Sequence, residues 1–383
     1  MLNATLCDVI RWRKGEVLRV RREWPGAMEL DVTVPEGECR ALAYPPLVGR
    51  PEPGDTVLLN TTALAMGLGT GGYAMVVAVP DRLPQDPSGP GHLVKARYTP
   101  LQATVLGADE QDSPHHRILR DADSIDGMPV IVADLHSALP AVLCGLFDAA
   151  RSASGSSGAG DGGGDVPWPG PHPRVAYVMP DGGALPAWFS MSCARLRELD
   201  WLCGVVTTGQ AFGGDVEAVT LHTGLLAARH VLGADVAVVA QGPGNLGTGT
   251  RWGFSGVSAG EAVNAAAVLG GRPVAALRVS EGDQRERHLG VSHHSLTAYG
   301  RVALARAQVV VPELPGEFGG RVAGQARALA ARHELVGVPV DGLYEALRRS
   351  PVRLSTMGRG LDEDLACFLA SAAAGRHAAS LLA

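Results

Sequence analysis

The residues with the widest choice of chemistry in this sequence lie in the stretch RERHLGVSHHS, from Arg285 to Ser295. It contains His288, His293 and His294. Imidazole titrates near neutral pH, so a histidine can donate or accept a proton during catalysis when an acidic neighbour fixes its tautomer. We therefore predict that these three histidines are catalytic and act in proton transfer.

Metal binding is the alternative role for the same histidines. His293 and His294 are adjacent, so on a helix their side chains diverge by about 100° and do not easily bind one ion. A catalytic metal would need distant ligands, for which Asp181, Asp215 and Asp283 are candidates. The sequence thus leaves the metal, and any other cofactor, unknown.

Two arginines in the stretch suggest an anionic ligand. The guanidinium groups of Arg285 and Arg287 match the geometry of carboxylates and phosphates. A purely structural reading is also open, in which Ser292 caps a helix, one histidine packs in the core and the arginines are solvated.

The elements that would position this stretch follow from about residue 128, where apolar strands, polar turns and amphipathic helices alternate. Near-continuous apolar strands that alternate with helices are typical of a parallel sheet covered on both faces. We expect an α/β fold with a doubly wound, mostly parallel, Rossmann-like sheet, whose strand carboxyl ends form the rim that binds ligands. The predicted strands are PVIVAD, RVAYVMP, LCGVVTT, DVAVVAQ, PVAALRV and QVVVPEL.

The first part of the chain has a different pattern. Short runs of period two, separated by Pro/Gly turns, predict a small antiparallel β-barrel or sandwich. We expect a β-rich domain over residues 1–100 and an α/β domain over 101–383. A Gly/Ser/Pro-rich stretch at about 152–173 cannot form a core and is predicted to be a disordered insertion.

A glycine-rich loop, GPGNLGTGT, follows the strand DVAVVAQ. The next helix is predicted to begin at Ser258, with a capping box to Glu261. This is too late for a dinucleotide site, and the loop lacks the lysine of an NTPase. Ser258 lies in a GxSxG pattern but far from its strand, so a helix cap is favoured over a nucleophile. A concave loop of backbone N–H groups can still bind an anion. The candidate ligand-binding residues are Asp181, Gly182, Gly244, Gly247, Thr248, Gly249, Thr250, Arg285 and Arg287.

Two further acids join the candidate catalytic set. Asp215 and Glu217 are predicted to begin the helix DVEAVTLHTGLLAARHVL. Acids are favoured at that position by the helix dipole alone, but at the rim they could also act as a base or a ligand.

Composition limits the partners and the compartment. A net charge of −6 argues against nucleic acid, which needs a concentrated basic face. The first twenty residues contain no apolar signal region, and no window is apolar enough for a membrane span. The six cysteines are scattered, as in a cytoplasmic protein with reduced thiols.

Several longer motifs together resemble a bacterial family known as domain of unknown function 3866. They are DGGALP, TTGQAFGGDVEAV, GPGNLGTGTRWGFSG, RVSEGDQRERHLGVSHHSLTAYGR and STMGRG. The resemblance implies a soluble bacterial protein and assigns no reaction. It also implies that eight candidate residues fall within the characteristic motifs of the family. They are Asp181, Asp215, Glu217, Arg285, Arg287, His288, His293 and His294.

The sequence therefore favours a small-molecule enzyme of the hydrolase or transferase type. It would bind an anionic or phosphorylated ligand at the rim, with His, Arg and Asp side chains for acid and base chemistry. A non-catalytic metabolite-binding protein or an assembly scaffold is the alternative. A homo-oligomer is left open.

Overall fold

The computed structural model describes residues 9–69, 71–153 and 172–382, which divide into two compact units. The first unit contains the described residues up to Pro90 together with Ala96–Thr104, and the second contains Gly91–Lys95 and the chain from Val105 onward. The predicted insertion at 152–173 lies almost entirely outside the described residues. None of the helices described is both long enough and apolar enough to cross a membrane.

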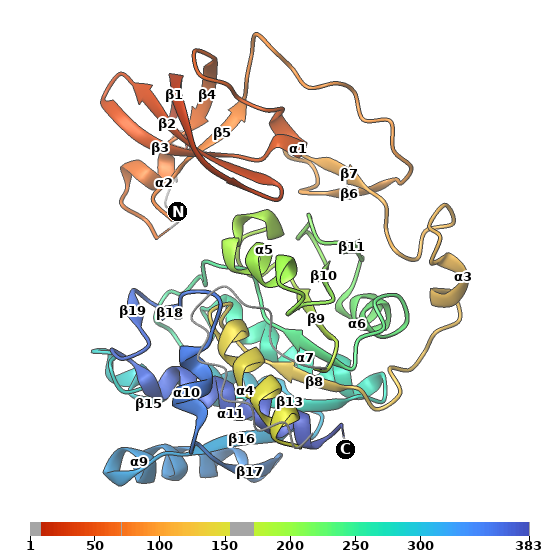
Figure 1. Cartoon of the computed structure of the whole chain (residues 1–383), viewed down its shortest axis with the longest axis vertical. Coiled ribbons are helices and arrows are strands. Elements are labelled where there is room, and N and C mark those ends of the chain that lie inside the picture. The colour runs from red at the N-terminus through yellow and green to blue at the C-terminus, as the bar shows by residue number, and fades with distance from the viewer. Residues whose placement is uncertain (1–8, 70, 154–171, 383) are drawn as a thin grey trace, which may run out of the picture. The chain divides into compact units, whose positions relative to one another are not determined.

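The first unit is a closed five-stranded barrel, ordered β1-β2-β3-β5-β4, with β4 pairing back to β1 (Figure 1). Alternate side chains such as Val17, Leu30 and Leu59 fill its interior. Gly15 sits where a Cβ atom would lie 2.6 Å from a Val32 methyl group, so the strand can approach its neighbours only as glycine. The strands are β1 (Trp12–Trp24), β2 (Ala27–Val34), β3 (Gly37–Ala43), β4 (Thr56–Asn60) and β5 (Ala74–Ala78), with short helices α1 (Pro45–Val48) and α2 (Thr62–Ala65).

The second unit is built on an eight-stranded sheet in which every neighbouring pair is parallel. In order across the sheet the strands are β11 (Val216–Glu217), β10 (Gly204–Thr207), β9 (Val175–Met179), β12 (Val236–Val239), β8 (Pro129–Val132), β13 (Arg272–Ala276), β16 (Gln308–Glu313) and β17 (Glu334–Pro339). The predicted α/β fold class is confirmed, and the six predicted strands are all present. The two unpredicted strands are the sheet edges, where a two-residue strand and a half-exposed one give weak patterns.

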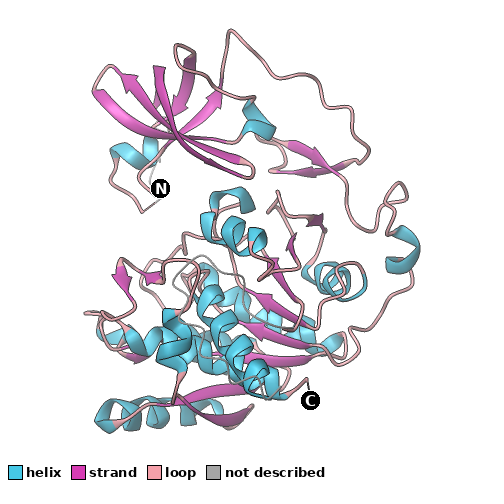
Figure 2. Cartoon of the chain, viewed as in Figure 1, coloured by secondary structure: helices cyan, strands magenta, loops and turns pink. Residues whose placement is uncertain are grey.

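Helices cover both faces of this sheet, as Figure 2 shows. One face is covered by α6 (Leu221–His230), α7 (Ser258–Val268) and α9 (Gly316–Ala326). The other is covered by α4 (Ala138–Ala153), α5 (Met191–Glu198), α10 (Leu343–Arg348) and α11 (Leu365–Ser380). The backbones of α4 and α11 pack in near contact, because a Cβ atom on Gly145 would lie 1.9 Å from the carbonyl oxygen of Ala372.

Two predicted helix starts need correction. Asp215 and Glu217 do not begin a helix: Glu217 lies in β11, and α6 begins at Leu221 with Thr220 as its cap. A hydrogen-bonded partner strand thus overrides the acidic helix-start signal. Helix α7 does begin at Ser258, but the Ser258 hydroxyl donates to the carbonyl of Ser255 at 3.1 Å and does not cap the helix.

Several short elements complete the second unit and its connection to the first. They are β6 (Leu93–Lys95), β7 (Ala103–Val105), α3 (His116–Leu119), β14 (Val279–Ser280), β15 (Gly290–Val291), α8 (His293–Thr297), β18 (Ser355–Thr356) and β19 (Arg359–Gly360). Short 3-10 turns are η1 (Ala187–Phe189), η2 (Ser255–Val257), η3 (Glu286–His288) and η5 (Arg327–Leu329), and η4 (Ala298–Val302) is a π-helix.

The strand order marks where a ligand site should form. Strand β8 is central, and the chain passes from β12 on one side of it to β13 on the other. In open α/β sheets, ligands bind beyond the strand carboxyl ends at such a switch point. The residues that follow these three strands are therefore of most interest.

Candidate functional site

Three polar residues stand at equivalent positions at the ends of the central strands. Each lies two residues after the end of its strand: Asp134 after β8, Gln241 after β12 and Arg278 after β13. All three are buried, and Gln241 Nε2 donates to the Asp134 carbonyl at 2.9 Å. None was predicted as a site residue, although the rule that chemistry gathers at strand carboxyl ends points to each of them.

His294 binds to this set directly. Its Nδ1 lies 3.1 Å from Asp134 Oδ2 and 3.1 Å from Arg278 Nη1. The ring also stacks on Phe254, with centroids 3.8 Å apart. Burial raises the pKa of Asp134, but the hydrogen bond from His294 and the charge of Arg278 outweigh it, so the pKa lies below its ordinary value. Asp134 is thus a buried carboxylate.

His288 reaches the same place from the turn η3. It is buried, and its Nδ1 lies 2.8 Å from the hydroxyl oxygen of Ser292. That oxygen also accepts a hydrogen bond from the His294 amide, so Ser292 caps α8, as the structural reading of the sequence proposed. Burial, with the charge of Arg278, lowers the pKa of His288 to about 3. The ring is therefore uncharged at neutral pH.

His293 is the first residue of α8 and the least satisfied member of the group. Its Nε2 atom is buried and has no hydrogen-bond partner among the described residues. Burial, with the neighbouring His294, lowers its pKa to about 4, so this ring is also uncharged at neutral pH. A buried polar atom without a partner is costly in a folded protein, so this nitrogen is free to bind a water molecule, an ion or a ligand.

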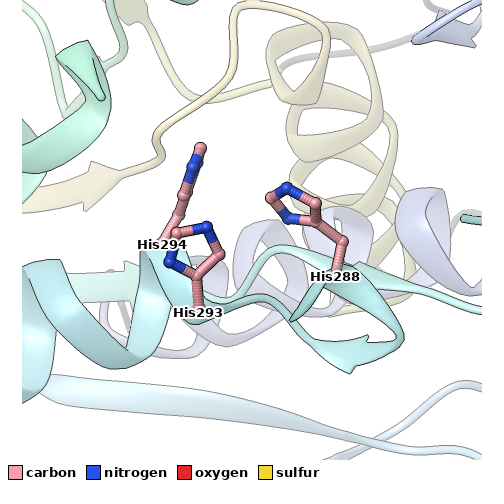
Figure 3. Close-up of side chains that lie close together, drawn as sticks. All are labelled: His288, His293 and His294. Atoms are coloured by element: carbon pink, nitrogen blue, oxygen red, sulfur yellow. The ribbon is translucent and has the colours of Figure 1, made fainter. Parts of the chain in front are cut away.

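The three histidines face one another, as Figure 3 shows. One ring nitrogen of each lies within 4.8 Å of the others, close enough to hold a metal ion after small rotations. The ring nitrogens of adjacent His293 and His294 thus lie closer together than their divergence on a helix led us to expect. Side chains of a first helical turn lean toward the helix N-terminus, and His288 approaches from that end.

Arg285 is held by an ion-pair network. Its Nη2 lies 2.6 Å from Asp283 Oδ2, and this hydrogen bond holds the pKa of Asp283 well below its usual range. Arg359 contacts both Asp283, at 3.6 Å, and Asp364, at 3.0 Å. Asp364 also accepts from the Ser280 hydroxyl at 2.6 Å. The network fixes the segment before His288, and Arg285 is one of the residues that form it.

Arg287 and the glycine-rich loop lie together. The Arg287 guanidinium is 3.7 Å from where a Cβ atom of Gly249 would be. Residues Gly247 and Phe254 form a β-bridge that closes the loop, which places Phe254 against the histidines. The predicted ligand residues Gly244, Gly247, Thr248, Gly249 and Thr250 are exposed. Thr248, however, uses its amide in the loop, donating to Gly253 at 2.7 Å.

The Asp181-Gly182 turn contacts the buried group of Asp134, Gln241 and Arg278 through its glycine. A Cβ atom on Gly182 would lie 2.3 Å from Gln241 Oε1, so the turn packs directly on Gln241. Asp181 is exposed, and its Oδ2 accepts from the Gln210 amide at 2.7 Å. Gln241 Oε1 is itself buried without a hydrogen-bond partner in the part of the chain described.

Asp215 and Glu217 are not brought to the histidines. Glu217 lies in β11, which begins directly after Asp215, and four strands separate β11 from β13, so the two strands are five spacings or about 24 Å apart. Asp215 forms a bidentate pair with Arg197, with both distances 2.9 Å. Glu217 Oε2 accepts from the Thr207 hydroxyl at 2.7 Å and lies 3.5 Å from Lys95 Nζ. We refer to Lys95, Thr207 and Glu217 as the edge cluster.

Comparison with known proteins adds a family and no reaction. No protein with a curated description matches the sequence. A family model described as "Protein of unknown function (DUF3866)" matches residues 40–375, which includes every site residue named above. The resemblance seen in the sequence motifs is confirmed, and the chain belongs to the DUF3866 family.

Proposed function

We propose that the protein is a small-molecule enzyme of the hydrolase or transferase type, and that its reaction centre is a divalent transition-metal ion bound by His288, His293 and His294. The observation that carries the proposal is the convergence of three imidazoles within 4.8 Å, one of which has a buried nitrogen with no partner among the described residues. Three histidine ligands with one open position are typical of catalytic zinc.

The hydrogen bonds at Nδ1 favour the tautomers that a metal needs. Asp134 is a carboxylate, so it can accept a hydrogen bond from His294 Nδ1–H, and in that tautomer the Nε2 lone pair is free to bind an ion. Arg278 Nη1 lies equally close to this nitrogen, at 3.1 Å, and is 3.6 Å from Asp134 Oδ2, so a proton on Nδ1 requires Arg278 to turn toward the carboxylate. In the same way, a proton on His288 Nδ1, which lies 2.8 Å from the Ser292 hydroxyl oxygen, would leave Nε2 free.

The low pKa values also favour ligands over proton carriers. His288 and His293 have pKa values of about 3 and about 4, so they are neutral at physiological pH and bind a cation without first losing a proton. A histidine with so low a pKa is a weak base, and at pH 7 it is not present as the imidazolium that acts as a general acid. The proton-transfer role that the sequence suggested is therefore less well supported than metal binding.

A bound ion would activate water or polarise a substrate oxygen, which is hydrolase or transferase chemistry. Arg278 adds a positive charge beside the ion, and Asp134 compensates it at 3.6 Å. The ring nitrogens must come to about 3.4 Å from one another in a tetrahedral site with bonds of about 2.1 Å, so the rings need to move by about 1 Å.

We also propose that the protein works in a reducing compartment such as the bacterial cytoplasm. The cysteines within the described ranges, Cys39, Cys144, Cys193, Cys203 and Cys367, are free thiols. Free thiols persist where glutathione and thioredoxin keep them reduced.

The test is metal stoichiometry on the full chain. After chelation and dialysis against Co²⁺, we expect one equivalent by elemental analysis and the visible absorption of tetrahedral cobalt. His288→Ala and His293→Ala should lose both signals, whereas His222→Ala, on the exposed face of α6, should keep them. Binding that is absent in the wild type, or unchanged in both site variants, would refute the metal centre. Metal-dependent turnover of phosphate esters distinguishes an enzyme from a non-catalytic metabolite-binding protein.

A further inference from the structure

A groove of about 700 Å³ is lined in part by His293, one of the three histidines. One wall is formed by His293, Leu296, Thr297, Gly300 and Arg301, which run from α8 into the π-helix η4. These residues recur with the spacing of one helix face, so the groove follows this face from its first turn. Pockets of 300–1,000 Å³ hold ligands of metabolite size, and π-helical turns are frequent at functional sites.

The other walls make the groove basic. Arg251 comes from the loop after β12 and Arg332 from the turn after η5, so with Arg301 the groove has three guanidinium groups and no acidic lining residue. All three arginines are exposed, and within the described chain none has a carboxylate at ion-pair distance. Arg332 makes only a long hydrogen bond, 3.4 Å, to the carbonyl of Ala303. The groove is therefore a site of uncompensated positive charge in a chain whose net charge is −6.

Trp252 gives the groove a flat apolar surface. Its side chain lines the groove and is 55% exposed. An indole beside guanidinium groups suits a ligand that joins a ring to an anionic group, because rings stack on indole and guanidinium forks bind oxyanions.

We propose that this groove binds a phosphorylated small molecule that carries a flat ring, with the phosphates on Arg251, Arg301 and Arg332 and the ring on Trp252. Phosphate fits better than a carboxylate, because each phosphate supplies up to about two negative charges against three guanidinium groups. His293 lies in the groove wall, so the ligand reaches the reaction centre. Its role as substrate rests on the proposed function, whereas its binding does not.

The test is calorimetric titration of the full chain in EDTA with pyrophosphate, ADP and adenosine. We expect pyrophosphate to bind, and ADP to bind about five- to a hundredfold more tightly through stacking. Arg301→Ala and Arg332→Ala should each weaken both by about tenfold or more, because each removes a hydrogen bond to a charged group. Trp252→Ala should weaken only ADP. These residues are exposed, so the variants should fold, which thermal unfolding verifies.

The matched control is Arg306→Ala, an exposed arginine outside the groove, which should bind both ligands like the wild type. No pyrophosphate binding, or binding unchanged in both groove arginine variants, overturns the proposal. ADP no tighter than pyrophosphate overturns the ring assignment. Because EDTA removes metal, this titration does not depend on an ion at the histidines. Failure of the cobalt test with pyrophosphate binding intact therefore rejects the metal centre alone.

Discussion

Two buried groups of charged residues lie in the same parallel sheet, and they differ in one respect. At the centre, Asp134 and Arg278 support histidines, and both His293 Nε2 and Gln241 Oε1 lack partners in the described chain. In the edge cluster, Lys95 Nζ donates to the carbonyls of Ala211 and Ala218, each at 2.9 Å, and also contacts Glu217. Buried charge alone does not identify a site. Two of the buried polar atoms without a partner in the described chain lie beside the histidines, and Asn245 Nδ2 in the glycine-rich loop is another.

The largest expected effect is a loss of stability when the edge cluster is disrupted. Burial lowers the pKa of Lys95 and raises the pKa of Glu217, so each depends on the other for its charge. Lys95→Met leaves Glu217 buried without its cation and should reduce the free energy of unfolding by about 3–5 kcal/mol. Urea denaturation measures this loss. The double variant with Glu217→Gln should regain part of it, and cobalt binding per folded molecule should not change in either.

A smaller effect is expected from the carboxylate behind His294. Asp134→Asn keeps the shape but removes the charge that fixes the His294 tautomer, so metal affinity should fall by about 10- to 100-fold. Competition with a chromogenic chelator measures the change. His222→Ala, on the exposed face of α6, is the control and should keep the wild-type metal affinity. An Asp134→Asn protein with wild-type metal affinity would show that the Asp134–His294 bond has no part in ion binding.

The smallest effect concerns the network that holds the segment before His288. Asp283 has a folded-state pKa well below its unfolded value of about 3.9, so its contribution to stability is complete above that pH and is lost as the pH falls below it. Asp283→Asn should cost about 1–2 kcal/mol at pH 7, the scale of a hydrogen bond to a charged group. The difference from wild type should shrink below about pH 4.

Unfolding curves at several pH values test this prediction. Asp112→Asn is the control, since Asp112 is exposed and forms no ion pair with any described residue. A pH-independent difference between wild type and Asp283→Asn would mean that the side chain acts through its shape and not through its charge.

Features that are encoded by neighbouring residues could be predicted from the sequence, and features that depend on distant parts of the chain could not. Apolar runs such as PVIVAD and DVAVVAQ are local, so the fold class and six strands followed from them. The histidines were identified by type and spacing. Asp134 and Arg278 were missed because their place beside His294 depends on strand order, which no local pattern encodes. Asp215 and Glu217 were predicted wrongly as partners of the histidines because strand order, which places them at the sheet edge, is also not encoded in a local pattern.

The groove residues could not be predicted from the sequence for a related reason. Arg251, Arg301 and Arg332 are separated by 50 and 31 positions and meet only because α8, η4 and η5 pack together. Exposed arginines carry no periodic signal, so nothing in their neighbourhood distinguishes them from solvated ones.

The packing of α4 against α11 bears on how the chain folds during synthesis. The two helices are more than 200 residues apart, yet α11 supplies Phe368 and Ala372 to the core that also contains Ile131 of the central strand β8. On the ribosome, the face of the sheet that α4 and α11 share therefore stays only partly covered until α11 has emerged. The barrel, complete by β5, can fold long before. We expect nascent chains stalled before Leu365 to contain a protease-resistant barrel and a protease-sensitive second unit.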